Sequence, residues 1–117
     1  MNNVDVSDYS DIIGKEVSGI IDRPIGSCHP KYPDIIYPVN YGYIPDIFAG
    51  DGEEQDVYFL GTNKPVTTFS GKIIAVYHRF DDNEDKWIVA NSNDYTNKEI
   101  LDAIHFQEKY FNCKLYR

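Results

Sequence analysis

The sequence has little of what defines several large classes of protein. It contains only two cysteines, Cys28 and Cys113, without a CxxC spacing, so we expect two reduced thiols rather than a disulfide framework or a thiolate zinc site. No apolar run approaches the length of a membrane span, and residues 1–11 lack the basic flank and apolar stretch of a signal peptide. We therefore predict a cytoplasmic protein that has no membrane partner.

Basic residues are also scarce. The chain has 11 Lys and Arg against 19 Asp and Glu, a formal net charge of −8. A protein that binds a nucleic-acid backbone needs a basic face, so the charge argues against a nucleic-acid partner. An acidic protein that handles an anion must first recruit cations, which points to metal, although an acidic soluble surface is the simpler explanation of the charge taken alone.

Several catalytic signatures are missing. The sequence has no HExxH zinc motif, no GxSxG elbow and no nucleotide-binding P-loop or GxGxxG segment. His29, His78 and His105 share no metal-ligand spacing, and histidines on a surface or helix face are the simpler interpretation. The absence of a nucleotide fingerprint agrees with a substrate that carries no base.

The composition suits one folded domain. The 117 residues are 42% hydrophobic and 15% aromatic, which is enough for a core. We predict a single domain over 1–117, with residues 1–12 as a loose lead-in. Alternating or apolar runs predict strands at 15–23, 57–60, 72–80 and 86–91, the last two forming a hairpin with an acidic tip. The five prolines between 24 and 45 require an extended or looped segment.

One helix is predicted, from Asn97 to about Phe111. Thr96 and Glu99 fit a capping box at its start. Ile100, Leu101, Ile104 and Phe111 recur at helical spacing and should face the sheet. The fold class is therefore mainly β with one C-terminal helix, arranged as a small antiparallel barrel or sheet (α+β) and not as alternating βαβ units.

The segment Gly50-Asp51-Gly52-Glu53-Glu54-Gln55-Asp56 is the first acidic constellation. Residues i and i+2 of an extended chain share a face, so Asp51 and Glu53 can converge, with Asp56 arriving from the start of the next strand. Carboxylates at 4 Å repel by about 4 kcal/mol per pair at an effective dielectric near 20, and a divalent cation would relieve that strain. An exposed acidic turn is the alternative.

The second acidic constellation is Asp81-Asp82-Asn83-Glu84-Asp85, at the hairpin tip. An EF-hand interpretation fails, because Lys86 stands where the turning glycine belongs and Ser92 replaces the closing glutamate. A solvated tip is the simpler interpretation. The segment becomes functional only if folding brings it beside residues 51–56, since two such loops would suit a multi-metal phosphoryl-transfer site.

Two motifs in order give the sequence a family resemblance. Tyr37-Pro38-Val39-Asn40-Tyr41-Gly42-Tyr43-Ile44-Pro45, followed by Asp51-Gly52-Glu53-Glu54-Gln55-Asp56-Val57, resembles the soluble, Mg²⁺-dependent inorganic pyrophosphatases. The resemblance is strong over 37–60 and weak from about Ile20 to Phe111. It implies an OB-like pyrophosphatase-type β-barrel in a shortened, divergent member of that family.

The resemblance also implies roles for individual residues. Its metal ligands would be Asp51 and Asp56, with Asp22 assisting and with Asp85 and either Asp81 or Asp82 from the second loop. Glu53 would orient or deprotonate the attacking water and, with the bridging Asp56, form the catalytic pair. The residues that would contact substrate are Lys31, Tyr41, Lys86 and Tyr110.

The chain departs from the family pattern at several positions, and the metal half of the site is better kept than the phosphate half. Glu53 is one methylene longer than the usual aspartate, and Glu54 replaces a proline. The short connection from Lys31 to Tyr37 lacks the hairpin that carries a phosphate-binding arginine, a charge that Arg23 or Arg79 could supply. Phe111 replaces a lysine.

The resulting prediction is an inorganic diphosphatase that uses two or more Mg²⁺ ions and is a possible homo-oligomer. The alternatives are a hydrolase of another phosphoanhydride and an inactive metal- or phosphate-binding relative.

Overall fold

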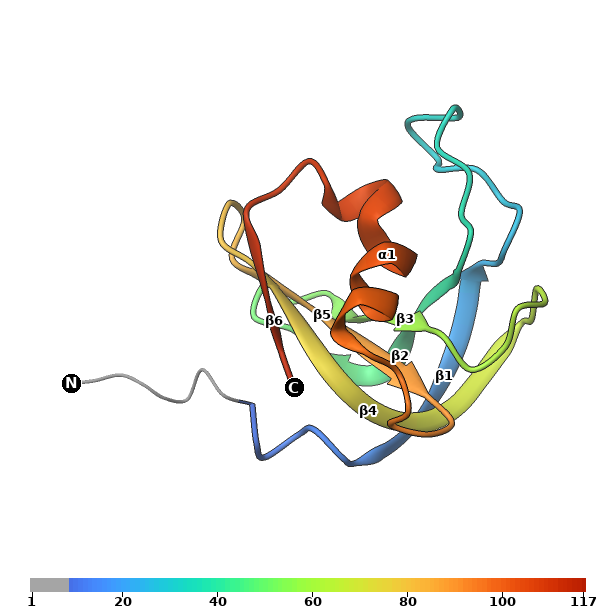
Figure 1. Ribbon diagram of the computed structural model, residues 1–117. Coiled ribbons are helices and arrows are strands. Elements are labelled where there is room, and N and C mark those ends of the chain that lie inside the picture. Colours follow the sequence, from blue (N-terminus) through green and yellow to red (C-terminus); the bar gives the residue numbers. More distant parts are fainter. Residues whose placement is uncertain (1–8) are drawn as a thin grey trace.

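A computed structural model describes residues 9–117 as a curved β-sheet that encloses one side of a single helix (Figure 1). The prediction of a mainly β fold with one helix is confirmed. The elements, in chain order, are β1 (Glu16–Arg23), β2 (Asn40–Phe48), β3 (Glu54–Phe59), β4 (Thr68–Arg79), β5 (Glu84–Ala90), α1 (Asn97–Glu108) and β6 (Cys113–Tyr116).

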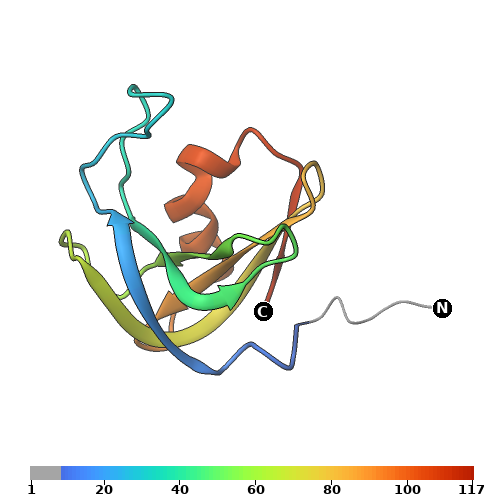
Figure 2. The same cartoon turned by 180° about the vertical axis from the view of Figure 1, so that it is seen from behind.

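The sheet closes on itself. Its strand order is β1-β2-β3-β5-β4-β6, and an additional pairing of β1 with β4 joins the first five strands into a barrel, visible from behind in Figure 2. All these pairs are antiparallel except β3 with β5. β4 is long enough to pair with β1 through its first half and with β5 and β6 through its second. This closure explains how a chain of this length forms a barrel without an open edge on β1.

Strand alternation divides the core into two clusters. Val57, Phe59 and Val89 point into the barrel, with Ile21, Ile44, Phe69, Ile73 and Val76. Tyr58 and Ile88, the intervening residues, point to the opposite face and pack under α1. Successive side chains of a strand lie on opposite faces, so the same alternation decides which polar residues share the helix side of the sheet.

Gly42 allows β1 and β2 to approach closely. A Cβ atom at this position would lie 1.8 Å from the backbone oxygen of Ile20, a distance that no side chain tolerates. The glycine in the Asn-Tyr-Gly segment therefore permits close contact between two backbones.

Helix α1 begins as the sequence predicts. The Thr96 hydroxyl accepts a hydrogen bond from Glu99 N at 3.1 Å, and Glu99 accepts one from Thr96 N at 2.8 Å, which confirms the capping box. Ile100 and Ile104 are fully buried against the sheet. The helix ends at Glu108, earlier than predicted, and Leu101 is 38% exposed, so its expected packing against the sheet is wrong.

The lead-in is partly packed onto the barrel. Residues 1–8 lie outside the described residues. Residues 10–14 form turns, and Tyr9, Ile12 and Ile13 pack against the barrel core. The Tyr9 hydroxyl donates to Asp85 Oδ1 at 2.9 Å and its ring meets Tyr116 edge-on. The expectation of a loose segment is therefore wrong for residues 9–12.

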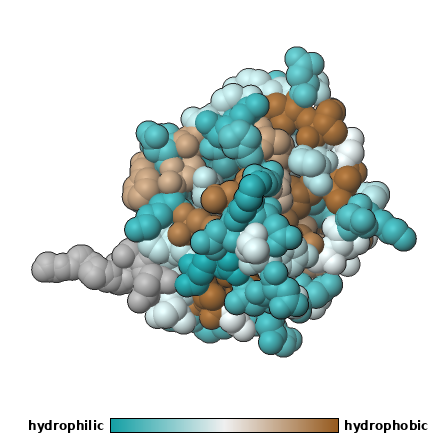
Figure 3. All heavy atoms as spheres, viewed as in Figure 1, coloured by the Kyte–Doolittle hydropathy of each residue, from teal (hydrophilic) through white to brown (hydrophobic). Residues whose placement is uncertain are grey.

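The loop of residues 24–39 stands out from the barrel above α1, at the upper right of Figure 1. Brown, apolar atoms gather at the upper right of Figure 3, on the side of this loop. Within the loop, Tyr32 and Ile36 are 60% and 53% exposed. Cys28 is exposed, Cys113 is half-buried, and both are free thiols. No helix within residues 9–117 has the length and apolar character needed to cross a bilayer.

Candidate active site

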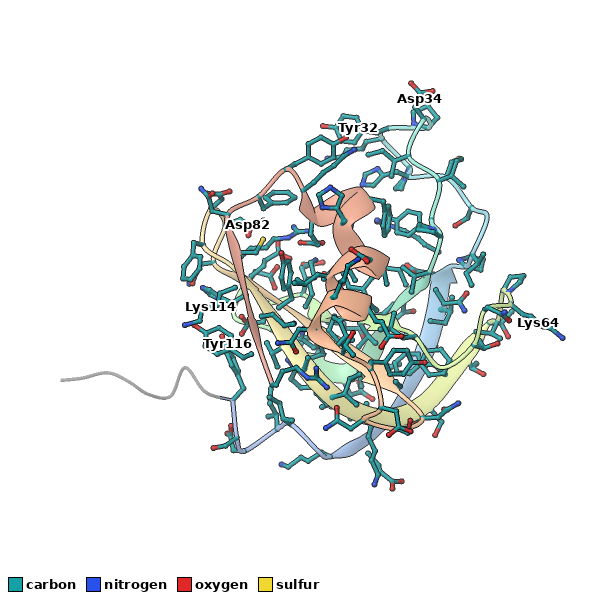
Figure 4. All side chains as sticks on the ribbon, in the orientation of Figure 1. Tyr32, Asp34, Lys64, Asp82, Lys114 and Tyr116 are labelled. Atoms are coloured by element: carbon teal, nitrogen blue, oxygen red, sulfur yellow. The ribbon has the colours of Figure 1, made fainter. Side chains whose placement is uncertain are left out.

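A cavity of about 1140 Å³ lies on the helix side of the sheet, between the 24–39 loop, the β2–β3 turn and the end of α1. Figure 4 labels Tyr32 and Asp34 at the outer end of the loop and Asp82 at the opposite side, near the β4–β5 turn. Six acidic and four basic side chains line the cavity: Asp22, Asp34, Asp51, Glu53, Asp56, Glu84, Arg23, Lys31, Arg79 and Lys86. Charges of both signs therefore line one cavity.

Register brings the strand residues of this site together. Tyr43 lies opposite Asp56 across β2 and β3. Val57 pairs with Trp87 across β3 and β5, which places Asp56 beside Lys86. Because Val57 points into the barrel, Asp56 before it and Tyr58 after it share the helix side of the sheet. Residues distant in sequence thus meet on one face.

A β-bulge explains how two consecutive residues line the cavity. The pairing of β1 with β2 shifts register between Ile21 and Arg23, where a bulge inserts one extra residue. Asp22 and Arg23 consequently both face the cavity instead of pointing to opposite sides. Burial raises the pKa of Asp22, the neighbouring Arg23 opposes that rise, and the Asp56 carboxylate adds to it. The pKa of Asp22 therefore depends on both the Arg23 cation and the Asp56 carboxylate.

Lys86 is the central buried cation. Its ammonium donates to Asp56 Oδ2 at 2.6 Å, to Glu84 Oε1 at 2.9 Å and to the Tyr41 hydroxyl at 2.9 Å, and the residue is 3% exposed. Burial alone lowers the pKa of Lys86, but the oxygens of Tyr41 and Asp56 outweigh it and hold the pKa above its ordinary value. Burial in turn raises the pKa of Tyr41, so its hydroxyl stays protonated at neutral pH.

The two acidic segments meet through Glu84 and not through Asp85. Glu84 and Lys86 share one face of β5, and the intervening Asp85 points the other way, where its Oδ1 lies 2.6 Å from His78 Nδ1 and accepts from Tyr9. Asp85, which the resemblance assigns to the metal site, thus does not line the cavity, whereas Glu84 does.

Asp81 and Asp82 also lie outside the cavity lining. Asp81 accepts hydrogen bonds from the backbone and side-chain nitrogens of Asn112, at 2.8 and 3.2 Å. Asp82 pairs with Arg79 at 3.3 Å. Asp81 therefore ties the hairpin tip to the segment after α1, whereas Asp82 pairs within the hairpin, and neither carboxylate lines the cavity.

The turn between β2 and β3 presents two carboxylates. Asp51 Oδ1 accepts a hydrogen bond from Glu53 N at 3.0 Å, and Gly52, between them, has φ +87°, a conformation that favours glycine. Asp51 and Glu53 are exposed and both line the cavity. Glu54 turns aside, where its carboxylate accepts from Asp46 N at 3.3 Å. The local sequence thus directs Asp51 and Glu53 to the site and Glu54 away from it.

Lys31 and Tyr110 form the outer rim of the cavity. Both are exposed, Tyr110 to 62%, and both line the cavity as the sequence predicts. His29, which the sequence did not mark as functional, lines it too. Its Nδ1 accepts from Lys31 N at 3.0 Å and from Tyr32 N at 3.3 Å, so this histidine shapes the turn that carries Lys31.

Arg79 is fixed to the end of α1. Its Nε and Nη2 donate to the two carboxylate oxygens of Glu108 at 2.6 and 2.7 Å, and Arg79 and Glu108 are only 6% and 2% exposed. Its guanidinium also lies 3.9 Å from the ring centroid of Phe111. Phe111 thus contacts a cation and not the sheet surface expected from the helical pattern. The two oxygens of Glu108 bind the Nε and Nη2 groups together, and this bidentate contact holds Arg79 in one orientation.

The donor chemistry of the site fits a hard divalent cation. The carboxylates of Asp22, Asp51, Asp56 and Glu84 open onto one cavity, and such oxygen ligands are those that Mg²⁺ prefers. Over residues 9–117, no three His, Cys, Asp or Glu side chains are already gathered as a metal-binding group. The Lys86 ammonium lies between Asp56 and Glu84 and balances their charges.

The comparison with protein families decides the relationship. The family model described as inorganic pyrophosphatase matches residues 22–113, which include each lining residue considered above. The chain belongs to the inorganic pyrophosphatase family.

Two curated pyrophosphatases show the extent of the similarity. The inorganic pyrophosphatase of Saccharolobus solfataricus is 33% identical over 98 residues, covering 68% of this chain and 56% of its own length. Soluble inorganic pyrophosphatase 2 of Chlamydomonas reinhardtii is 30% identical over 96 residues, covering 76% of this chain and 50% of its own length. The chain spans about half the length of the curated relatives it matches.

Solved structures of pyrophosphatases share the fold. The inorganic pyrophosphatase of Ehrlichia chaffeensis superposes with a TM-score of 0.68 at 21% identity, covering 94% of this chain and 90% of that one. The Helicobacter pylori inorganic pyrophosphatase gives 0.66 at 15% identity, covering 99% and 90%. The pyrophosphatase-type barrel predicted from the two motifs is confirmed.

Proposed function

We propose that this protein is an inorganic diphosphatase that hydrolyses pyrophosphate to two phosphates with Mg²⁺ as cofactor. The observation that carries the proposal is the meeting of Asp51, Glu53 and Asp56 with Glu84 and Lys86 in one cavity of a pyrophosphatase-family barrel. Pyrophosphate hydrolysis needs charge neutralisation and positioning more than covalent chemistry, and this cavity offers carboxylates and cations from separate segments.

The proposed metal-binding residues are Asp51, Asp56 and Glu84, with Asp22 beside them. Glu84 takes the place first expected for Asp85, because its carboxylate faces the cavity. When bound, the ions would neutralise phosphate charge and acidify a water molecule, the chemistry that this reaction requires.

The chain's own residues would position substrate and proton. Glu53, which is exposed at the turn and lines the cavity, would accept the proton of the attacking water. Tyr41 would donate to a phosphate oxygen from the cavity floor, where Lys86 would attract the anion by its charge, and Lys31 and Tyr110 would donate from the rim. The longer reach of Glu53 compared with aspartate would shift that proton acceptor by about 1 Å, a displacement that can lower a rate a hundredfold. We therefore expect modest turnover.

The direct test is release of phosphate from pyrophosphate with and without Mg²⁺. The wild-type protein should release phosphate only with the metal, and Asp56→Asn should reduce the rate at least a hundredfold, because Asp56 is both a proposed ligand and a partner of Lys86. Asp102→Asn is the matched control, since Asp102 lies exposed on α1 and pairs with Lys98. The control should keep wild-type activity.

Other outcomes separate the remaining candidates. Saturable Mg²⁺ binding without phosphate release would favour an inactive binding relative. Turnover of another phosphoanhydride in place of pyrophosphate would assign the site to that substrate. A cytoplasmic location and a homo-oligomeric state remain part of the proposal, tested by fractionation and by light scattering.

A further inference from the structure

The four basic residues of the cavity differ in whether their charged groups are already paired with carboxylates. Lys86 is bound to Asp56, Glu84 and Tyr41. Arg79 is bound to Glu108 through both arms of its fork. Lys31 is exposed on the outer loop. Arg23 is the half-buried cation that has no carboxylate within salt-bridge distance among residues 9–117.

The Arg23 guanidinium lies on an aromatic support. Its carbon is 5.3 Å from the ring centroid of Tyr41 and 5.7 Å from that of Tyr37, and Nη1 donates to the Tyr37 hydroxyl at 2.6 Å. An arginine carries five N–H donors, so most of those of Arg23 remain available on the cavity side. These cation–π contacts hold the guanidinium beside two rings without consuming its donors.

We propose that Arg23 is the phosphate-binding arginine of this cavity and that Tyr37 and Gln107 are positioning residues for it. The proposal rests on the proposed function, which it deepens by assigning the guanidinium that grips a phosphate group of the substrate. A phosphate oxyanion accepts two parallel N–H bonds from a guanidinium, and these charge-assisted bonds are stronger than neutral ones. Arg79 is a structural cation that holds α1.

A buried hydrogen-bond chain supports the positioning role. The Tyr37 hydroxyl accepts from Arg23 and donates to Gln107 Oε1 at 2.7 Å. Gln107 Nε2 donates to the Tyr58 hydroxyl at 2.5 Å, and Tyr58 donates to Glu108 Oε2 at 2.5 Å. Each member donates towards Glu108, whose charge Arg79 balances from the far side. Each hydroxyl and the Gln107 amide has both a donor and an acceptor in this chain. The chain therefore holds the Tyr37 hydroxyl in one orientation, and the hydroxyl in turn positions Arg23.

The bulge in β1 makes this arrangement possible. Without the extra residue between Ile21 and Arg23, strand alternation would place Asp22 and Arg23 on opposite faces of the sheet. With it, one strand end delivers a carboxylate and a guanidinium to the same cavity. Metal and phosphate can therefore be held from adjacent positions of β1.

The test measures binding of methylenediphosphonate, a non-hydrolysable diphosphonate, by titration calorimetry in the presence of Mg²⁺. Arg23→Gln should weaken binding by about tenfold to a hundredfold, the range of one or two hydrogen bonds to a charged group. Arg23→Lys should recover part of the loss, because it restores charge but not the fork. Tyr37→Phe, which keeps the ring and removes the hydroxyl, should weaken binding a few-fold. In an active enzyme, these variants should raise KM more than they lower kcat.

Lys114→Gln is the charge-matched control, because Lys114 is exposed on β6, away from the cavity lining (Figure 4). It should bind the diphosphonate like the wild type, and a melting curve of each variant checks its fold. Equal affinity of Arg23→Gln and wild type, or no binding by either protein, would overturn the proposal. Diphosphonate binding that depends on Arg23 in a protein that releases no phosphate from pyrophosphate would uphold it and refute the proposed hydrolase activity.

Discussion

The imidazole of His29 organises the turn that carries Lys31. Its Nδ1 accepts two backbone N–H groups, those of Lys31 and Tyr32, and can do so only while that nitrogen is unprotonated. Burial lowers the pKa of His29, and the charges of Arg23 and Lys31 lower it further. The unfolded chain, with a histidine pKa near 6.5, therefore takes up a proton more readily than the folded protein.

This difference in pKa predicts a pH-dependent loss of loop order. The contribution of neutral His29 is complete above about pH 6.5 and is lost as the pH falls through the lower pKa of the folded state. An NMR titration should show the His29 ring and the amide protons of Lys31 and Tyr32 changing together, below pH 6.5. A His29 transition above that pH, or amides that do not follow it, would contradict the prediction.

At the scale of residues, eight of the eleven residues that the sequence proposed for the site line the cavity, and the three that do not, Asp81, Asp82 and Asp85, belong to the β4–β5 turn and the start of β5. Asp51, Glu53 and Asp56 were marked by their motif. The family motif pointed to Asp85 and not to Glu84. Which of these two neighbours faces the cavity depends on the register of β5, which the sequence does not determine. A bulge has no reliable signature in a single sequence, so the entry of both Asp22 and Arg23 required the structure.

At the scale of elements, the last turn of α1 is held to two strands by one carboxylate. Glu108 binds Arg79 of β4 and Tyr58 of β3, and all three side chains are buried. Removing one member of a buried ion pair leaves the other charge without a partner, which costs about 3–5 kcal/mol. The position of α1, and with it Tyr110 on the cavity rim, therefore depends on this pair.

We predict that Glu108→Gln lowers the free energy of unfolding by about 3–5 kcal/mol, measured by urea denaturation. The double variant Arg79→Met with Glu108→Leu should recover much of that loss, because it removes both charges. Asp102→Asn breaks the exposed pair with Lys98 and serves as the control, with little change expected. A loss under about 1 kcal/mol for Glu108→Gln would mean that solvent reaches Arg79.

Elements with local signals were predictable, and those defined by distant pairing were not. The capping box fixed the start of α1 within the sequence itself. β6 has only four residues and exists because it pairs with Val76–Arg79 of β4, a contact that no local pattern announces. The end of α1 was misplaced for a related reason, since Phe111 fits the helical period but leaves the helix to stack on Arg79.

At the scale of the whole molecule, the barrel contains an internal cation, Lys86, that balances the carboxylates of the cavity. The Lys86 ammonium binds two of the carboxylates proposed as metal ligands, so the folded chain does not rely on a divalent ion to relieve their repulsion. The sequence had suggested the opposite, that crowded carboxylates would be strained without metal. Strand register could not be derived from spacing, so neither could the place of Lys86 between them.

We therefore predict that chelation leaves the fold intact. With EDTA, the far-UV circular dichroism spectrum should match that of the Mg²⁺-saturated protein, while Mg²⁺ should raise Tm in a saturable manner. A ligand at a hundred times its Kd stabilises the folded state by about 2.7 kcal/mol, which corresponds to several degrees in Tm. Asp56→Asn should lose that rise. Unfolding on chelation would show that the internal cation is insufficient.

The one-way hydrogen-bond chain from Arg23 to Glu108 also constrains how this sequence can diverge. Gln107 must present its oxygen to Tyr37 and its nitrogen to Tyr58. A substitution at any member therefore leaves a neighbouring donor or acceptor without its partner. The guanidinium groups of Arg23 and Arg79 are thereby linked through one chain of hydrogen bonds. Among descendants of this chain, we expect substitutions at these positions to appear together or not at all.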